Sequence, residues 1–106
     1  MPTFFEVEPQ GRFDPTRIIE DMLNSNATSL LFNEGVLPDA FFDLSTGIAG
    51  ELFNKTSTYQ VRLACVVSDL TSHSEQFQSL VREANRGNDI GFFHTREEAI
   101  RWLDAT

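Results

Sequence analysis

The chain has 106 residues, of which 41% are hydrophobic and 23% charged, and its formal net charge is −8. This length fits one domain, expected over residues 1–106, because a single core typically takes about 100 to 150 residues. The acidic excess would repel the phosphates of nucleic acids and of anionic membranes. In addition, no stretch approaches the about 20 apolar residues that cross a bilayer. We therefore exclude nucleic acid and membrane as partners.

The first residues and the single cysteine both favour a cytoplasmic protein. The N-terminus shows neither the basic start nor the long apolar segment of a secretory signal. Cys65 has no second cysteine to pair with, which agrees with a reducing compartment. Because it lies in the apolar run 61–67, we expect a buried thiol rather than a nucleophile. We expect no metal and no cofactor.

The N-terminal third predicts a strand, a helix and a second strand. Residues 4–7 form an apolar strand signal, and a turn at 9–11 allows a short returning strand at Arg12-Phe13. Asp14-Pro15 places an N-cap acceptor before a proline at the first helical position, and an apolar stripe at helical spacing follows. The short apolar run Thr28 to Phe32 predicts a buried strand.

The middle of the chain carries the stretch FFDLSTGIAGEL, residues 41–52. After a helical turn from Asp39 to Leu44, we expect a longer helix from about Ser45 to Ser57. Gly47 and Gly50 each weaken such a helix by up to about 1 kcal/mol relative to alanine. Their presence predicts the close approach of a neighbouring backbone.

The clearest strand is Tyr59 to Val67, which is rich in β-branched residues and apolar on both faces apart from two polar positions. This pattern is typical of an inner strand that helices cover on each side. A capping box at Ser72 and Glu75 then opens a helix that Gly87 ends.

The C-terminal part completes an alternation of strands and helices. Residues 90–93 form the last strand, and a capping box at Thr95 and Glu98 opens the final helix. Strands that alternate with helices favour right-handed crossovers and a mainly parallel sheet of the α/β class. We expect the N-terminal segment to add an antiparallel edge.

Two stretches resemble a known family over roughly residues 30–103. They are LLFNEGVLPDAFFDLSTGIAGELFNKTSTYQVRLACVVSD and REANRGNDIGFFHTREEAIRWL. Both resemble a family of small bacterial proteins described as domain of unknown function 4180, with its signature FFDL-x-TG-x-AGE. The resemblance implies a bacterial origin and no established activity.

A second resemblance concerns the four residues Ser45-Thr46-Gly47-Ile48. They are similar to the STAS domains of anti-sigma-factor antagonists, in which the first hydroxyl of such a pair is phosphorylated by a partner kinase. The closing segment TREEAIRWL and the element order are similar too. The resemblance implies a STAS-like α/β sandwich, with a mainly parallel four- to five-stranded sheet and alternating helices, that regulates by binding another protein.

The favoured site is a protein-binding surface around the central motif. Most of the ten phenylalanines are expected in the core, but a loop before a helix can present the Phe41-Phe42 pair and Phe53 to a partner protein or to a second copy of the chain. Ser45 is expected first as a cap and second as a phosphorylation switch, because Asp43 would repel an added phosphate. The predicted binding residues are Phe41, Phe42, Asp43, Ser45, Thr46 and Gly47.

The alternative is an enzyme or a small-molecule site at the carboxyl ends of the strands, where open α/β sheets usually place ligands. Polar residues follow three of the predicted strands, and they could act in acid–base chemistry: Asn33, Glu34, Asp69 and His94. His73 is expected to be an exposed residue early in a helix. The non-catalytic binding module remains the preferred interpretation because polar strand ends are common in proteins of many functions.

Overall fold

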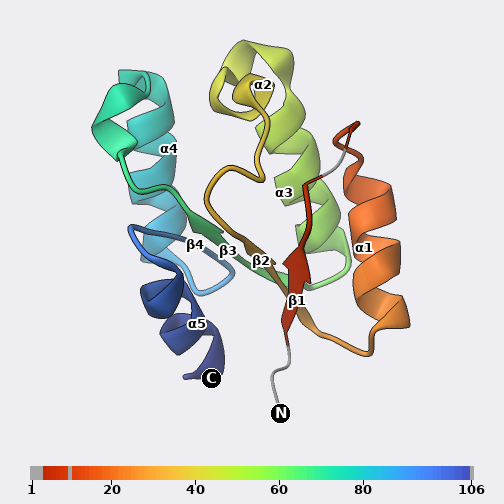
Figure 1. Cartoon of the computed structure of the whole chain (residues 1–106). Coiled ribbons are helices and arrows are strands. Elements are labelled where there is room, and N and C mark those ends of the chain that lie inside the picture. Colours follow the sequence, from red (N-terminus) through yellow and green to blue (C-terminus); the bar gives the residue numbers. More distant parts are fainter. Residues whose placement is uncertain (1–3, 10, 106) are drawn as a thin grey trace.

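A computed structural model describes residues 4–9 and 11–105, and its centre is a four-stranded, all-parallel sheet in the order β1-β2-β3-β4 (Figure 1). The strands are β1 (Phe4–Val7), β2 (Ser29–Phe32), β3 (Arg62–Val66) and β4 (Ile90–Phe93). The helices are α1 (Pro15–Asn24), α2 (Asp39–Phe42), α3 (Ile48–Thr58), α4 (Glu75–Arg86) and α5 (Arg96–Asp104), with 3-10 turns η1 (Leu44–Thr46) and η2 (Leu70–Ser72). This confirms the α/β class and is consistent with the STAS-like arrangement.

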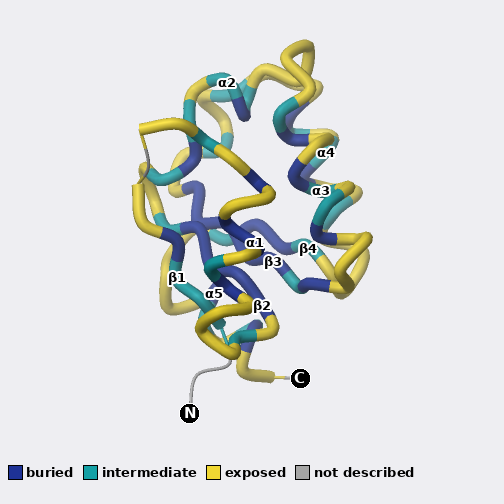
Figure 2. Tube along the Cα trace, turned by 90° about the vertical axis from the view of Figure 1, so that its right-hand side faces the viewer, coloured by how far each residue is buried: buried dark blue, intermediate teal, exposed yellow. Residues whose placement is uncertain are grey.

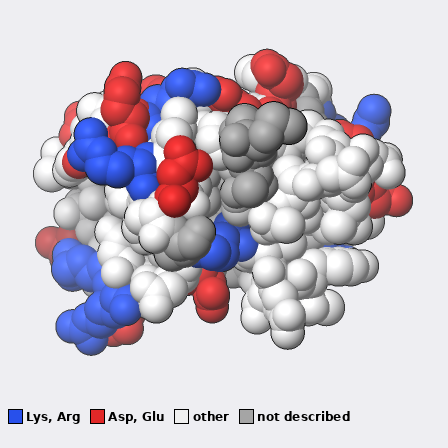
Figure 3. Space-filling model, turned by 90° about the horizontal axis from the view of Figure 1, so that it is seen from below, with Lys and Arg blue, Asp and Glu red and all other residues white. Residues whose placement is uncertain are grey.

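The helices divide unequally between the two faces of the sheet. In Figure 1, α3 and α4 lie above the sheet, α1 lies to its right beside α3, and α5 lies below it. The larger core cluster joins α1, α3 and α4 to one face of the strands, and a smaller cluster joins α5 to the other face. Figure 3 shows the molecule from below. Charged side chains gather on the left of this view, where Figure 1 also places α5, and the right side is largely uncharged.

The inner position expected for β3 is confirmed. Leu63 and Cys65 face the large cluster, whereas Ala64 and Val66 face α5, and all four side chains are buried. Figure 2 shows the dark blue of buried residues along this strand and its neighbour β2. Burial raises the pKa of the Cys65 thiol far above its ordinary range, so this thiol stays protonated.

β3 begins later than the sequence predicts, because the end of α3 occupies the preceding residues. Gln60 has a φ of 56°, in the left-handed region, and the Val61 amide donates to the Thr56 carbonyl at 2.8 Å. This is the geometry of a helix C-terminus that usually contains glycine. The prediction that the strand starts at Tyr59 is therefore wrong, and that side chain is exposed.

Side-chain caps define where three of the helices begin. The Asp14 carboxylate accepts from the amides of Thr16 and Arg17 and opens α1, as predicted. Thr95 accepts from the Glu98 amide at 3.2 Å and opens α5, also as predicted. The predicted capping box at Ser72 and Glu75 is wrong, because the N-cap of α4 is Ser74, whose hydroxyl accepts from the Phe77 amide at 3.1 Å.

The N-terminal segment is not an antiparallel edge. β1 pairs in parallel with β2, with Phe4 opposite Ser29. Arg12 and Phe13 adopt no strand; Phe13 instead packs against the core on the way into α1. The turn predicted at 9–11 includes Gln10, which lies outside the described residues.

An ion pair ties β1 to the helix on the far side of the sheet. Two nitrogens of Arg96, at the start of α5, donate to the Glu6 carboxylate at 2.7 and 3.1 Å. Asn33 donates to the same carboxylate at 3.3 Å. The hydrogen bonds from Arg96, reinforced by Asn33, hold the pKa of Glu6 below its ordinary value. The contact therefore joins β1, the end of β2 and α5.

The free edge of β4 is capped by a side chain. Asn85, near the end of α4, accepts from the Phe92 amide at 2.7 Å and its amide nitrogen lies 3.4 Å from the Phe92 carbonyl. The Asn85 amide thus takes the place that a neighbouring strand would occupy.

None of the helices in the described part of the chain has the length and apolar character that crossing a bilayer requires.

We predict that Arg96→Met lowers stability in a pH-dependent way. A depressed Glu6 pKa stabilises the fold above the carboxyl's ordinary pKa of about 4.3, and this contribution is lost as the pH falls through the folded-state value. The free energies of unfolding of wild type and variant, from urea titrations, should differ at pH 7 and converge as the pH drops below about 4. Arg101→Met, at an exposed position of the same helix, is the control, and a gap that stays constant at low pH would contradict the prediction.

Candidate functional site

A groove runs across the carboxyl ends of the inner strands, and we call it the rim groove. Its outer hollow, of about 510 Å³, lies between α2, η1 and the start of α4. Its inner hollow, of about 280 Å³, lies over the ends of β2 and β3. The two hollows adjoin, because four residues line both of them: Asp39, Phe42, Ser72 and His73.

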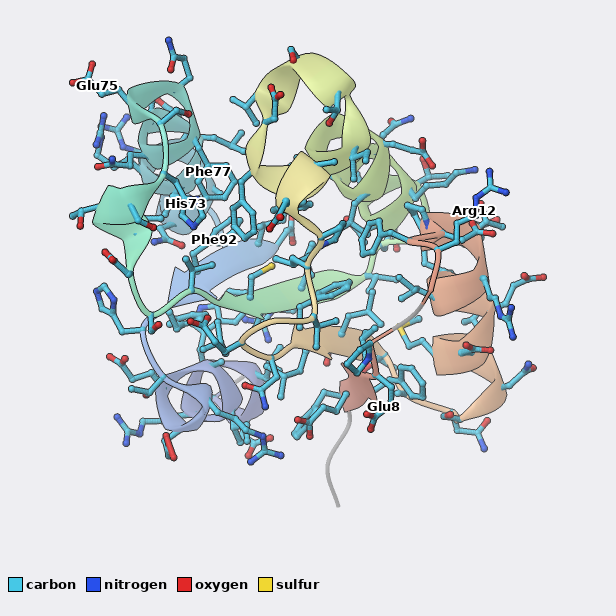
Figure 4. All side chains as sticks on the ribbon, turned by 45° about the horizontal axis from the view of Figure 1, so that its top comes forward. Glu8, Arg12, His73, Glu75, Phe77 and Phe92 are labelled. Atoms are coloured by element: carbon cyan, nitrogen blue, oxygen red, sulfur yellow. The ribbon has the colours of Figure 1, made fainter. Side chains whose placement is uncertain are left out.

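Two stacked rings form the apolar floor of the rim groove. The Phe42 ring and the His73 imidazole lie parallel within 9°, with centroids 4.0 Å apart. The ring of Phe77, from α4, packs edge-on against both of them. Its centroid lies 5.0 Å from that of Phe42 and 5.4 Å from that of His73. Figure 4 shows His73 and Phe77 on the same side of the molecule as Phe92 of β4, with Glu75 pointing away from them. The ring pair is therefore fixed by the core beneath it.

Phe41 belongs to the core and is absent from the groove lining. Its side chain is 0% exposed, and its ring packs edge-on against Phe13, Phe53 and Phe77 with centroids 5.9 to 6.5 Å apart. The prediction that Phe41 lies on a contact surface is wrong, because a residue buried this fully has no face left for a partner. Phe53 likewise packs against the chain's own core.

The core expectation for phenylalanine holds more generally. The large hydrophobic side chains that stand exposed in the described residues are Leu23, Leu44 and Tyr59, and none is a phenylalanine. Of the predicted aromatic surface, Phe42 alone reaches the groove, half-buried. Leu44 extends the apolar surface at the outer hollow, where it is 37% exposed.

The motif residues 43–47 build a tight turn before α3 rather than its first turn. Asp43 accepts from the Ser45 hydroxyl at 2.6 Å and from the Ser45 amide at 3.0 Å. These two hydrogen bonds hold the pKa of Asp43 below its ordinary value, and the bond from the hydroxyl makes the larger contribution. The Thr46 hydroxyl lies 2.7 Å from the Ala40 carbonyl and accepts from the Ile48 amide at 3.3 Å. Thr46 therefore joins α2, η1 and α3.

This geometry corrects the expected start of the helix. α3 begins at Ile48 with Gly47 as its N-cap, so Ser45 does not lie in the helix and does not cap it. Its hydroxyl is exposed and lines the outer hollow. The capping role expected of Ser45 is carried instead by Asp43 for η1 and by Thr46 for the Ile48 amide.

The two glycines do not admit a neighbouring backbone, contrary to the sequence prediction. A Cβ atom added at Gly47 or Gly50 would meet nothing within 4 Å. Gly47 is needed for another reason, since its φ of 78° is a conformation that side chains other than glycine rarely adopt. Nothing in the structure explains Gly50.

We predict that Thr46→Val destabilises the protein more than Ser45→Ala does. The valine keeps the shape of the side chain but removes the hydroxyl that joins α2 to α3, and losses of this type are about 1 kcal/mol. Ser45 has a solvent-exposed hydroxyl, and water can replace it as a donor to Asp43. Chemical denaturation of both variants measures the difference; equal losses of stability would contradict the role assigned to Thr46.

The alternative rim site comes together in part. Asn33, Glu34 and Asp69 line the inner hollow, as the carboxyl ends of neighbouring parallel strands should. His94 lines neither hollow; it is exposed just after β4. The imidazole in the groove is that of His73, and the prediction that it is merely an exposed residue early in a helix is wrong. Only a correct placement of the α4 N-cap at Ser74 would have pointed to it.

The carboxylates of the inner hollow already have partners within the chain. The backbone amide and the hydroxyl of Ser68 donate to Glu34, the amide at 3.2 Å. The Thr71 hydroxyl donates to Asp69 at 2.7 Å. Across the described ranges no group of three or more His, Cys, Asp or Glu side chains is placed to hold a metal ion. The acidic groups of the groove are therefore spread along it rather than gathered at one point.

Comparison with known proteins identifies one family. Its model, described as "Domain of unknown function (DUF4180)", matches residues 10–103. The match confirms the resemblance seen in the sequence and begins earlier, ahead of the strand β2. No curated protein and no solved structure matches the chain.

Proposed function

We propose that this chain, which belongs to the family described as Domain of unknown function (DUF4180), is a non-catalytic regulatory module that binds another protein at the rim groove. The observation that carries the proposal is the combination of an apolar floor with an open rim. The stacked Phe42 and His73 rings pack against Phe77 of the core, and Leu44 stands exposed at the same hollow. Exposed apolar groups that gather in one place and are rimmed by polar residues are typical of surfaces that bind another protein.

The distribution of acid–base groups supports binding over catalysis. The Glu34 carboxylate accepts from the amide and the hydroxyl of Ser68, and these hydrogen bonds fix its direction. The imidazole expected beside it, that of His94, lies outside the groove. His73 is close by, but it stacks on Phe42. The trio predicted for the enzyme alternative, Glu34, Asp69 and His94, is thus not gathered in one hollow.

Site-specific photo-crosslinking tests the proposal. A photoreactive amino acid at Leu44 lies in the groove, and the same amino acid at Leu23, 53% exposed on α1, is the matched control on another surface. After irradiation in native cells, we expect a discrete adduct to one protein from position 44 and none from position 23. Mass spectrometry identifies it; a crosslink to a second copy of the chain would make the partner a homodimer. Identical adduct patterns from the two positions would contradict the proposal.

Phosphorylation of Ser45 is the regulatory step that we attach to this proposal. Its hydroxyl is exposed in the outer hollow and bonded to Asp43. A phosphate would add a charge of about −1.5 to −2 next to that carboxylate and to Asp39. No Lys or Arg is among the residues that line the hollow. The modification would therefore break the Ser45–Asp43 contact and change both the shape and the charge of the groove wall, which alters the affinity for the partner.

We predict that Ser45→Asp changes the affinity for the partner severalfold and that Ser45→Ala leaves it nearly unchanged. The aspartate places a second negative charge beside Asp43, whereas the alanine removes a hydrogen bond without adding charge. Binding of the crosslinked partner, measured by calorimetry with purified proteins, checks the pair. Unchanged binding in both variants would remove Ser45 from the mechanism.

A further inference from the structure

We infer that the segment bound in the rim groove is basic, with an arginine or lysine side chain placed on the Phe42–His73 floor. This inference rests on the proposed function, since it names the chemistry of the partner at the same groove. It is carried by the shape of the groove together with the charge of its walls.

The ionisable walls of the rim groove are negative. Four carboxylates line its two hollows, and the lining includes neither lysine nor arginine: Glu34, Asp39, Asp43 and Asp69. His73 is the one imidazole among these residues. A positively charged partner group would therefore meet an attractive carboxylate on each side of the ring pair, and an acidic group would be repelled.

The charge of these carboxylates is not neutralised within the described part of the chain. Their donors are the uncharged groups of Ser45, Ser68 and Thr71. The ion pairs of the described residues lie elsewhere, at Arg86–Glu83 and Arg96–Glu6. Hydrogen bonds from hydroxyls and amides fix the direction of a carboxylate and leave its negative charge available to a partner.

The floor suits the remaining parts of a basic side chain. Arginine and lysine carry apolar stems that pack on hydrophobic surface while their charged ends stay near water and carboxylates. A guanidinium also stacks favourably on aromatic faces. Phe42, His73 and Asp39 line both hollows, so the ring pair and a carboxylate lie together where the two hollows meet. A chain segment can continue from there along the outer hollow past Leu44.

Peptide titrations followed by two-dimensional ¹H–¹⁵N NMR test the inference. The probes are a short peptide of alternating arginine and leucine, the same peptide with glutamate in place of arginine, and free spermine. We expect the arginine peptide alone to shift the amides of Phe42, Leu44 and His73, with an affinity that falls as salt is added. Binding by the double variant Asp39→Asn/Asp43→Asn should weaken about tenfold; the asparagine can still accept from Ser45, so the turn is retained.

The matched control is Glu20→Gln/Glu97→Gln, which removes the same total charge from exposed positions outside the groove. The affinity of this control variant for the arginine peptide should change less than twofold if the carboxylates of the groove contact the peptide directly. Equal weakening in the two double variants would overturn the inference, as would equal or tighter binding of spermine with the same shifts. Binding of the glutamate peptide in the groove would contradict the inference that the bound segment is basic, and it would leave the proposed function intact. Shifts confined to other surfaces would contradict both.

Discussion

The handedness of parallel crossovers is the constraint on which this molecule depends. Neighbouring strands in the order β1-β2-β3-β4 all run in the same direction, so each connection must cross the sheet. Because such crossovers are right-handed, repeating them in one direction along the sheet places every connecting helix on the same face. The result is the three-helix layer of α1, α3 and α4, with its large aromatic core. α5 follows the last strand and connects to nothing further, so it alone is free to cover the opposite face.

This arrangement also decides where partner chemistry can be placed. The connections that leave β2 and β3 begin side by side at one edge, and both are long enough to form short helical turns before their main helices. The α2–η1 turn brings Phe42 to that edge, and the η2 turn brings His73 to meet it. The stacked rings are thus the contact between two crossover connections. Phe77 packs edge-on against both rings and extends the core to the groove.

Sequence reasoning was most successful where one local pattern determines an element, and least where two patterns compete. β3, β4, α4 and α5 follow from β-branched runs and apolar periodicity. The start of α3 was misplaced because Ser45 and Thr46 are both good capping residues, and only the left-handed Gly47 decides between them. The start of β3 was misplaced because Gln60 takes a conformation usually reserved for glycine. At the site, parallel strand ends predicted Asn33, Glu34 and Asp69, but the η2 turn that brings in His73 leaves no periodic signal.

Asn85 has a consequence for how copies of this protein can assemble. Its amide occupies the backbone groups of Phe92 at the outer side of β4. A strand from another molecule could pair with Phe92 only by displacing the Asn85 side chain, which already makes the hydrogen bonds that a strand would make. Growth of the sheet into an open-ended filament needs two receptive borders, one for each neighbour. Because the backbone groups of Phe92 already have a partner, the β4 border offers an incoming strand fewer free donors and acceptors, which disfavours growth of the sheet on that side.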